Sequence, residues 1–143
     1  MPIIGFNFDK MYIERKKPIS KDIKVKNDMV IKDIKPIKVG FAKKQEEVLK
    51  FDFKYTAKYD PNIAEILIEG NVLYLSEEKE TKKILEEWKK TKKTPVKTTM
   101  QIVNTILIKC GIKALSLSQD LNLPPHIRLP IIAPKIDKSD YIG

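Results

Sequence analysis

The chain has 143 residues, which is enough for one domain with a single hydrophobic core. It carries 28 Lys and Arg residues against 19 Asp and Glu residues, and this net charge of +9 favours a polyanionic partner, above all nucleic acid. The single cysteine excludes an internal disulfide and a thiolate metal cage. No stretch of about 18 apolar residues occurs, and the first residues lack the pattern of a signal peptide, so we expect a cytoplasmic protein with no membrane partner.

The first two predicted strands have imperfect patterns. Residues 3–14 place Phe6, Phe8 and Tyr12 on one side of a period-2 alternation that Lys10 interrupts. Residues 29–41 form the second strand, and its proline, Pro36, favours an edge position or a bulge.

The third predicted strand, residues 48–59, has the clearest alternation in the chain. One of its faces is apolar and consists of Leu49, Phe51, Phe53, Tyr55, Ala57 and Tyr59, which indicates a strand buried on one side. Residues 63–75 form the fourth strand, where Gly70 suggests a bulge or a close approach of backbones. The short connections between these strands favour an antiparallel sheet.

Two helices are predicted after the strands. Residues 76–93 form the first, with Ser76 as its N-cap and lysines in its last turn. The second begins at Thr94-Pro95 and ends near Cys110, with Gly111 as the stop signal. Apolar residues at alternating spacings of four and three predict a stripe that faces the core or a partner helix, made of Val96, Met100, Val103, Leu107 and Cys110.

The end of the chain is apolar but unsuited to regular structure. Residues 116–134 contain Pro124, Pro125, Pro130 and Pro134, which exclude a long helix or a central strand. The order of elements predicts an α+β fold in which a four-stranded antiparallel sheet is followed by two helices packed on one face and an extended proline-rich C-terminal arm. We expect one domain over residues 1–134 and a tail over residues 135–143.

Catalytic groups are scarce in this sequence. His126 is the only histidine and Cys110 the only cysteine, so a Cys–His dyad is formally possible, but Cys110 lies among apolar helical positions where a small hydrophobic residue packs. No glycine-rich phosphate loop and no metal-ligand spacing is present. We therefore expect no enzymatic activity, no cofactor and no metal.

Two basic runs are candidates for contacts with phosphates. Either run alone reads as a solvated surface, and the second also complements a helix dipole. Together with the net charge they predict binding to RNA, with affinity that falls as salt rises. The candidate RNA-binding residues are Arg15, Lys16, Lys17, Lys89, Lys90, Lys92, Lys93 and Arg128.

Three segments, EEVLKFDFKYTAKYDPNIAEILIEGNVLYL, VKTTMQIVNTILIKCGIKAL and LNLPP, together resemble the SecB chaperone family over roughly residues 6–130. In this resemblance, residues 121–124 match a segment of LNLAP type, and Gly111 matches the glycine after the family's helix. The resemblance implies four antiparallel strands followed by helices, an extended segment that packs by its leucines, and subunits that pair into dimers and tetramers. We expect a divergent, basic member of this family, of archaeal origin.

The charge of this chain departs from that family. SecB proteins are acidic and pass clients to the SecA motor through acidic residues on the sheet, whereas this chain is basic and offers only Glu65 and Glu69 on its fourth strand. The motor-docking role is therefore not expected here.

Two functional hypotheses follow. The favoured one is a non-catalytic SecB-like protein that is associated with the ribosome through ribosomal RNA or ribosomal proteins. The alternative is a SecB-like holdase, free in the cytosol and oligomeric, that binds unfolded or nascent polypeptides through exposed apolar surface. The candidate polypeptide-binding residues are Phe41, Trp88, Leu121 and Leu123.

Overall fold

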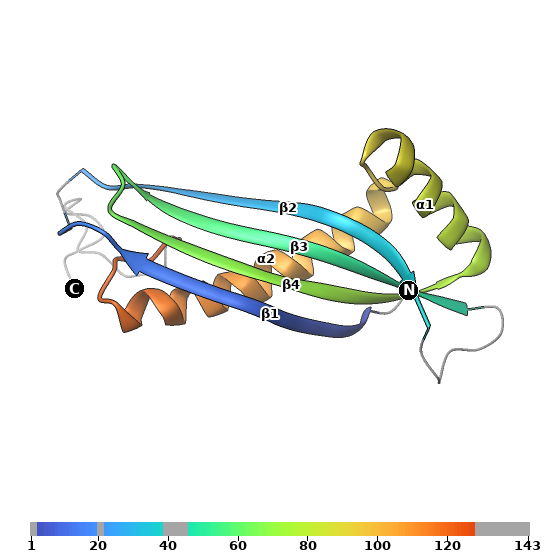
Figure 1. Ribbon diagram of the computed structural model, residues 1–143, viewed down its shortest axis with the longest axis horizontal. Helices are drawn as coiled ribbons and strands as arrows, with labels where there is room; N and C mark the ends of the chain where they lie inside the picture. Colours follow the sequence, from blue (N-terminus) through green and yellow to red (C-terminus); the bar gives the residue numbers. More distant parts are fainter. Residues whose placement is uncertain (1–2, 20–21, 39–45, 128–143) are drawn as a thin grey trace, which may run out of the picture.

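The computed structural model describes residues 3–19, 22–38 and 46–127. Four long strands come first, followed by two helices that lie on the same face of the sheet (Figure 1). This arrangement confirms the predicted α+β class. The elements are β1 (Ile3–Arg15), β2 (Lys24–Ile37), β3 (Glu46–Asp60), β4 (Ala64–Glu77), α1 (Glu78–Thr91) and α2 (Val96–Asp120).

The sheet is antiparallel throughout, in the order β1-β4-β3-β2. The two central strands are β4 and β3, and β1 and β2 form its two edges. Pro36 therefore lies on an edge strand, as predicted, and a break in the register of β2 between Ile31 and Asp33 adds a bulge nearby. The free edge of β2 becomes important for the functional site.

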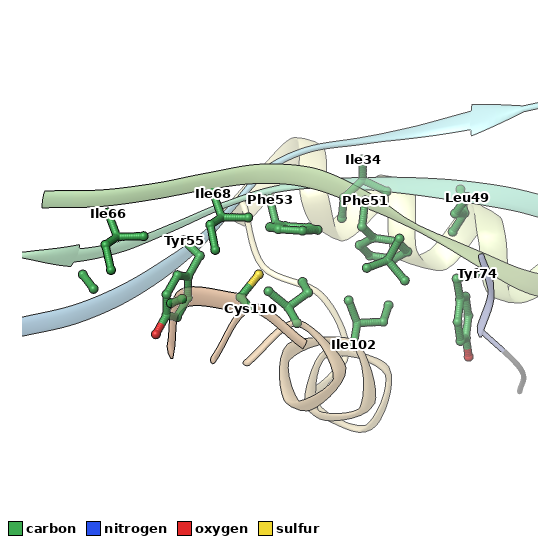
Figure 2. Packing of buried hydrophobic residues seen from close by; sticks show 14 of the residues in the cluster. Ile34, Leu49, Phe51, Phe53, Tyr55, Ile66, Ile68, Tyr74, Ile102 and Cys110 are labelled. Carbon is green, nitrogen blue, oxygen red and sulfur yellow. The ribbon is translucent and has the colours of Figure 1, made fainter. Parts of the chain in front are cut away.

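The core lies between the sheet and the helices. All six predicted apolar residues of β3 are buried, and the alternate residues of β4, such as Ile66 and Ile68, face the same side. Figure 2 shows these side chains meeting Ile102 and Cys110 of α2. The period-2 prediction for β3 is confirmed because one face of this central strand is covered by helices, while most side chains on its other face are polar and partly exposed.

The interruption in β1 is a bulge at Asp9. The register with β4 shifts between Phe8 and Lys10, so Phe6 and Phe8 pack against the core while Tyr12 points to the opposite face. The sequence prediction that placed Tyr12 beside the two phenylalanines is wrong, because the extra residue reverses the side on which every later side chain lies.

The first helix begins later than predicted. Ser76 is the buried penultimate residue of β4, where its hydroxyl hydrogen-bonds with that of Thr81, and Glu77 occupies the N-cap position without a capping side-chain bond. The helix ends at Thr91, and the next residue, Lys92, has a left-handed φ of 59° and donates its backbone N–H to the carbonyl of Trp88. Only Thr81, Ile84 and Trp88 of α1 are buried.

The second helix runs past its predicted stop. Gly111 is an interior residue of α2, and the helix ends nine residues later at Asp120. Asn122 has φ 54°, its N–H donates to Gln119 O at 3.1 Å, and Leu123 N donates to Ser118 O at 2.8 Å. This pair of bonds is a Schellman motif with asparagine in the left-handed position. Residues 116–120, predicted as extended, are therefore helical, and the described part of the arm is limited to residues 121–127.

The buried face of α2 also differs from the predicted one. Apart from Gly111, the buried residues recur every four positions, as Thr98, Ile102, Ile106, Cys110, Ala114 and Ser118. Because four residues turn a helix by about 400°, this stripe drifts around the helix by about 40° at each step, and a long helix follows a twisted sheet in this way. Of the predicted stripe only Cys110 is buried, while Val96, Met100 and Leu107 are exposed.

Gly111 gives a direct test of this correction. No atom lies within 4 Å of the position that a Cβ would occupy there, and its φ is not positive. Gly111→Ala should therefore stabilise the protein by about 0.5–1 kcal/mol, because alanine removes unfolded-state freedom and favours helix. Urea unfolding measures this difference. A loss of stability would show that the helix stops at Gly111 after all.

Candidate polypeptide-binding groove

A groove runs beside the edge strand β2, between that strand and the helices. Its larger hollow has a volume of about 620 Å³ and is lined by residues of β2, of the end of α1 and of the first half of α2. The lining residues are Met29, Val30, Ile31, Trp88, Lys92, Lys93, Thr94, Val96, Thr99, Met100, Val103 and Asn104.

A second hollow of about 360 Å³ continues along the same two elements. Its apolar lining comes mainly from the second half of α2, and Asn27 of β2 and Tyr55 of β3 complete it. Ile127 of the arm closes its side. We call the two hollows together the β2–α2 groove. From Val96 to Leu115 it extends for about 28 Å, the length of roughly eight extended residues.

The position of α2 on the sheet leaves this groove open. The helix packs against β4, β3 and β1, whereas β2 packs against α1. Part of β2 therefore has no helix across it. Met29 and Ile31 point to the helix side of the sheet and Val30 to the other, yet all three line the groove. Neighbouring residues of opposite orientation share a hollow only where it reaches the strand's edge, so the unpaired backbone of β2 borders the groove.

The wall that α2 contributes is unusually apolar for an exposed surface. Its side chains Val96, Met100, Leu107, Ile108 and Ile112 are between 42% and 75% exposed. Only 22% of the most apolar part of α2 is buried, and by length and composition alone the helix is apolar enough to cross a membrane. This qualifies the expectation from sequence, which found no such segment. Here the helix lies along the sheet (Figure 1). The apolar side chains of α2 that the sheet leaves uncovered line the groove.

The predicted RNA-binding residues are not brought together. Arg15 donates to the carbonyl of Leu121 at 3.4 Å, just after the end of α2. Lys93 comes three residues before the start of α2. The two basic runs are thus separated by most of a helix that is about 37 Å long (Figure 1). Lys16 is also partly neutralised, with Glu14 at 3.9 Å and Glu65 at 3.8 Å.

The predicted polypeptide-binding residues have different positions. Trp88 lies in the wall of the groove, where it is 8% exposed. Leu123 is buried in the core and Leu121 packs against that core, so both anchor the arm. Phe41, and Arg128 of the RNA-binding set, lie outside the described residues. The sequence prediction missed the exposed residues of α2, although the width of the apolar surface on that helix was the available signal.

The arm is attached to the sheet by hydrogen bonds from side chains of β2 and β3. The Tyr59 hydroxyl donates to Pro124 O at 2.6 Å, and Asn27 Nδ2 donates to His126 O at 3.1 Å. The Tyr55 hydroxyl in turn donates to Asn27 Oδ1 at 3.3 Å. These bonds hold residues 124–127 against β2 and β3, which fixes Ile127 at the end of the groove.

The nucleophile considered from sequence is not activated. Burial raises the pKa of the Cys110 thiol to about 12, so it stays protonated at neutral pH and packs as an apolar side chain. Among the described residues, no three His, Cys, Asp or Glu side chains form a group that could hold a metal ion.

His126 makes stability depend on pH. Burial lowers the pKa of this imidazole below its ordinary 6.5, and neither ring nitrogen has a hydrogen-bond partner among the described residues. Below pH 6.5 the unfolded chain takes up a proton that the folded chain resists. The free energy of unfolding should therefore fall as the pH is lowered through the ordinary pKa of 6.5, and the fall should end once the pH is below the lowered pKa of His126 in the folded protein.

His126→Gln should flatten this dependence, since glutamine does not titrate. Chemical unfolding of both proteins at a series of pH values measures the effect. An equal slope in the variant would assign the pH dependence to other groups.

Comparisons with known proteins bear on the fold. No family model and no curated protein sequence matches the chain. Among solved structures, it is similar to the SecB-like chaperone of Mycobacterium tuberculosis in complex with a ChAD peptide from the HigA1 antitoxin. The two share 9% sequence identity, with a TM-score of 0.53 over 92% of this chain and 89% of the other. The four-stranded antiparallel sheet followed by two helices is therefore a SecB-like fold.

Proposed function

We propose that this protein is a non-catalytic holdase of the cytoplasm that binds unfolded or nascent polypeptide segments in the β2–α2 groove. The observation that carries the proposal is the exposed apolar wall of α2 beside the free edge of β2. Exposed apolar surface on this scale is rare on soluble monomers, and where it occurs it usually marks the binding site of a partner. The groove matches an extended segment of roughly eight residues.

An extended polypeptide could bind in the groove as an additional strand beside β2. The backbone of the segment would pair with the free edge of β2, and alternate side chains would then point towards α2. Backbone pairing is independent of sequence, and apolar contact requires only apolar side chains, so such a site accepts many clients. The M. tuberculosis chaperone of similar fold was solved with a peptide, which supports this class of partner by analogy.

Polypeptide binding is preferred over association with ribosomal RNA for a structural reason. The net charge of +9 remains compatible with a polyanion, but the basic runs lie at opposite ends of α2 rather than on one patch. By contrast, the apolar residues of α2 converge with β2 on one groove.

Suppression of aggregation by the full-length protein tests the proposal. A model client that aggregates on dilution from denaturant should remain soluble when this protein is present in stoichiometric amounts. The effect should persist at high salt, because apolar contacts are not screened. If the client aggregates at its normal rate while the protein binds ribosomal RNA in a gel-shift assay, the ribosome-associated function replaces this one.

A further inference from the structure

The β2–α2 groove carries charge at one end only. Lys92 and Lys93 line the hollow between α1 and α2, and no acidic side chain lines either hollow within the described residues. At the other end the lining is uncharged, and its polar groups are Asn27 and the Tyr55 hydroxyl. The groove is therefore asymmetric, with a cationic end and a neutral end.

The two lysines are available to a ligand. Several other lysines, among them Lys16 and Lys32, form ion pairs with acidic side chains on the sheet. Lys92 and Lys93 form none with any described residue, and both are exposed. The Lys92 ammonium lies 5.2 Å from the centre of the Trp88 ring, a cation–π contact that holds the charge over the apolar wall.

We infer that the β2–α2 groove selects apolar segments that carry acidic residues at the end lying against Lys92 and Lys93. This inference rests on the proposed function and specifies its substrate class. Apolar side chains of the segment contact Met100, Leu107 and their neighbours on α2, and the acidic residues just beyond them meet the two lysines. The single cationic end would also set the direction in which a segment lies.

The expected selectivity is modest, because both lysines are exposed to solvent. An exposed ion pair contributes a few tenths of a kcal/mol to about 1 kcal/mol, so two pairs correspond to roughly a fivefold preference at low salt. Added salt screens the pairs and should remove the preference without removing binding. This dependence distinguishes selection by charge from binding by apolar contact.

Three labelled peptides with the same eight-residue apolar core test the inference. One end of the core carries three glutamates, three glutamines or three lysines, and fluorescence anisotropy with the full-length protein measures each dissociation constant. The glutamate peptide should bind roughly fivefold more tightly than the glutamine peptide at about 50 mM salt, and equally at about 500 mM. The lysine peptide should bind most weakly at low salt.

Two charge-reversal variants locate the effect. K92E/K93E should invert the preference in favour of the lysine peptide. K89E/K90E changes the net charge equally and lies in the last turn of α1, just before Lys92 and Lys93 but outside the groove lining, so it should leave the order unchanged. Equal binding of the three peptides at low salt, or equal effects of the two variants, would overturn the inference while leaving the proposed function intact.

A different result would overturn both proposals. If none of the peptides binds and sedimentation shows a stable dimer, a second copy of this chain covers the groove. If none of the peptides binds and the protein is a monomer, both proposals are also wrong, because the groove then binds no polypeptide from which it could select.

Discussion

Replacing Met100 and Leu107 by glutamine is expected to weaken the binding of an unfolded polypeptide roughly tenfold or more. Both side chains line the groove, and they are 57% and 42% exposed in the free protein. A bound client would cover them, and each apolar side chain that becomes covered contributes about 1–2 kcal/mol. Glutamine has a similar length, a good helix propensity and no charge, so the change removes mainly the apolar contact.

The stability of this double variant should remain close to that of the parent protein. Surface substitutions away from special features change the free energy of unfolding by about 0.5 kcal/mol or less each. Ile19→Gln is the matched control, because Ile19 is 44% exposed and does not line the groove. Anisotropy titrations with a labelled peptide measure the affinities. Equal losses in the double variant and the control would remove the groove as the binding site.

Replacing Gly70 by alanine is expected to destabilise the fold by about 3 kcal/mol or more. An added Cβ would lie 2.1 Å from the backbone oxygen of Asn7 and 2.8 Å from the Phe53 ring. The Asn7 carbonyl belongs to β1, which runs beside β4 here, so it can retreat only by separating the two strands. Asn71, next to Gly70, adds a constraint because it hydrogen-bonds with Asn7 at 3.1 Å and with Asp9 at 3.0 Å.

Urea unfolding measures the free energy of unfolding of Gly70→Ala, of Gly111→Ala and of the parent protein, and the two changes relative to the parent are then compared. The same chemical change should destabilise strongly at a close approach of two strands and stabilise slightly at an open helical position. A Gly70→Ala protein within about 1 kcal/mol of the parent would show that β1 does not approach β4 so closely.

The strands were predictable because burial of one face of a sheet imposes a period of two. In β3 this period is uninterrupted, so Phe51 and Phe53 could be assigned to the core from sequence. In β1 the bulge at Asp9 shifted the period, and no residue type at that position signals an extra residue.

The helices were harder to predict for two reasons. The end of α2 depends on Asn122 rather than on Gly111, since asparagine also adopts the left-handed conformation and Pro124 follows it. The buried face of α2 could not be chosen from sequence, because isoleucines occur on more than one side of the helix, as Ile106 and Ile108 show. The twist of the sheet decides which side is covered, and that information is not local.

The groove itself was not predictable from the sequence, because its walls come from elements far apart in the chain. Trp88 was a candidate from sequence, and it does lie in the groove wall. Four apolar residues of α2 in the opposite wall, Val96, Met100, Val103 and Leu107, belong to the stripe that the sequence predicts to face the core or a partner helix. Their exposure follows from the position of α2 over β4, β3 and β1, which leaves part of β2 uncovered.

Photo-crosslinking from defined positions tests most directly whether the β2–α2 groove holds polypeptide. A photoreactive phenylalanine derivative replaces Met100 in one protein and Tyr12 in another; both positions are exposed, but Tyr12 lies on the opposite face of the sheet. An unfolded client should crosslink to the protein labelled at Met100 and not to that labelled at Tyr12. Equal crosslinking from both positions, or crosslinking only from Tyr12, would contradict the account.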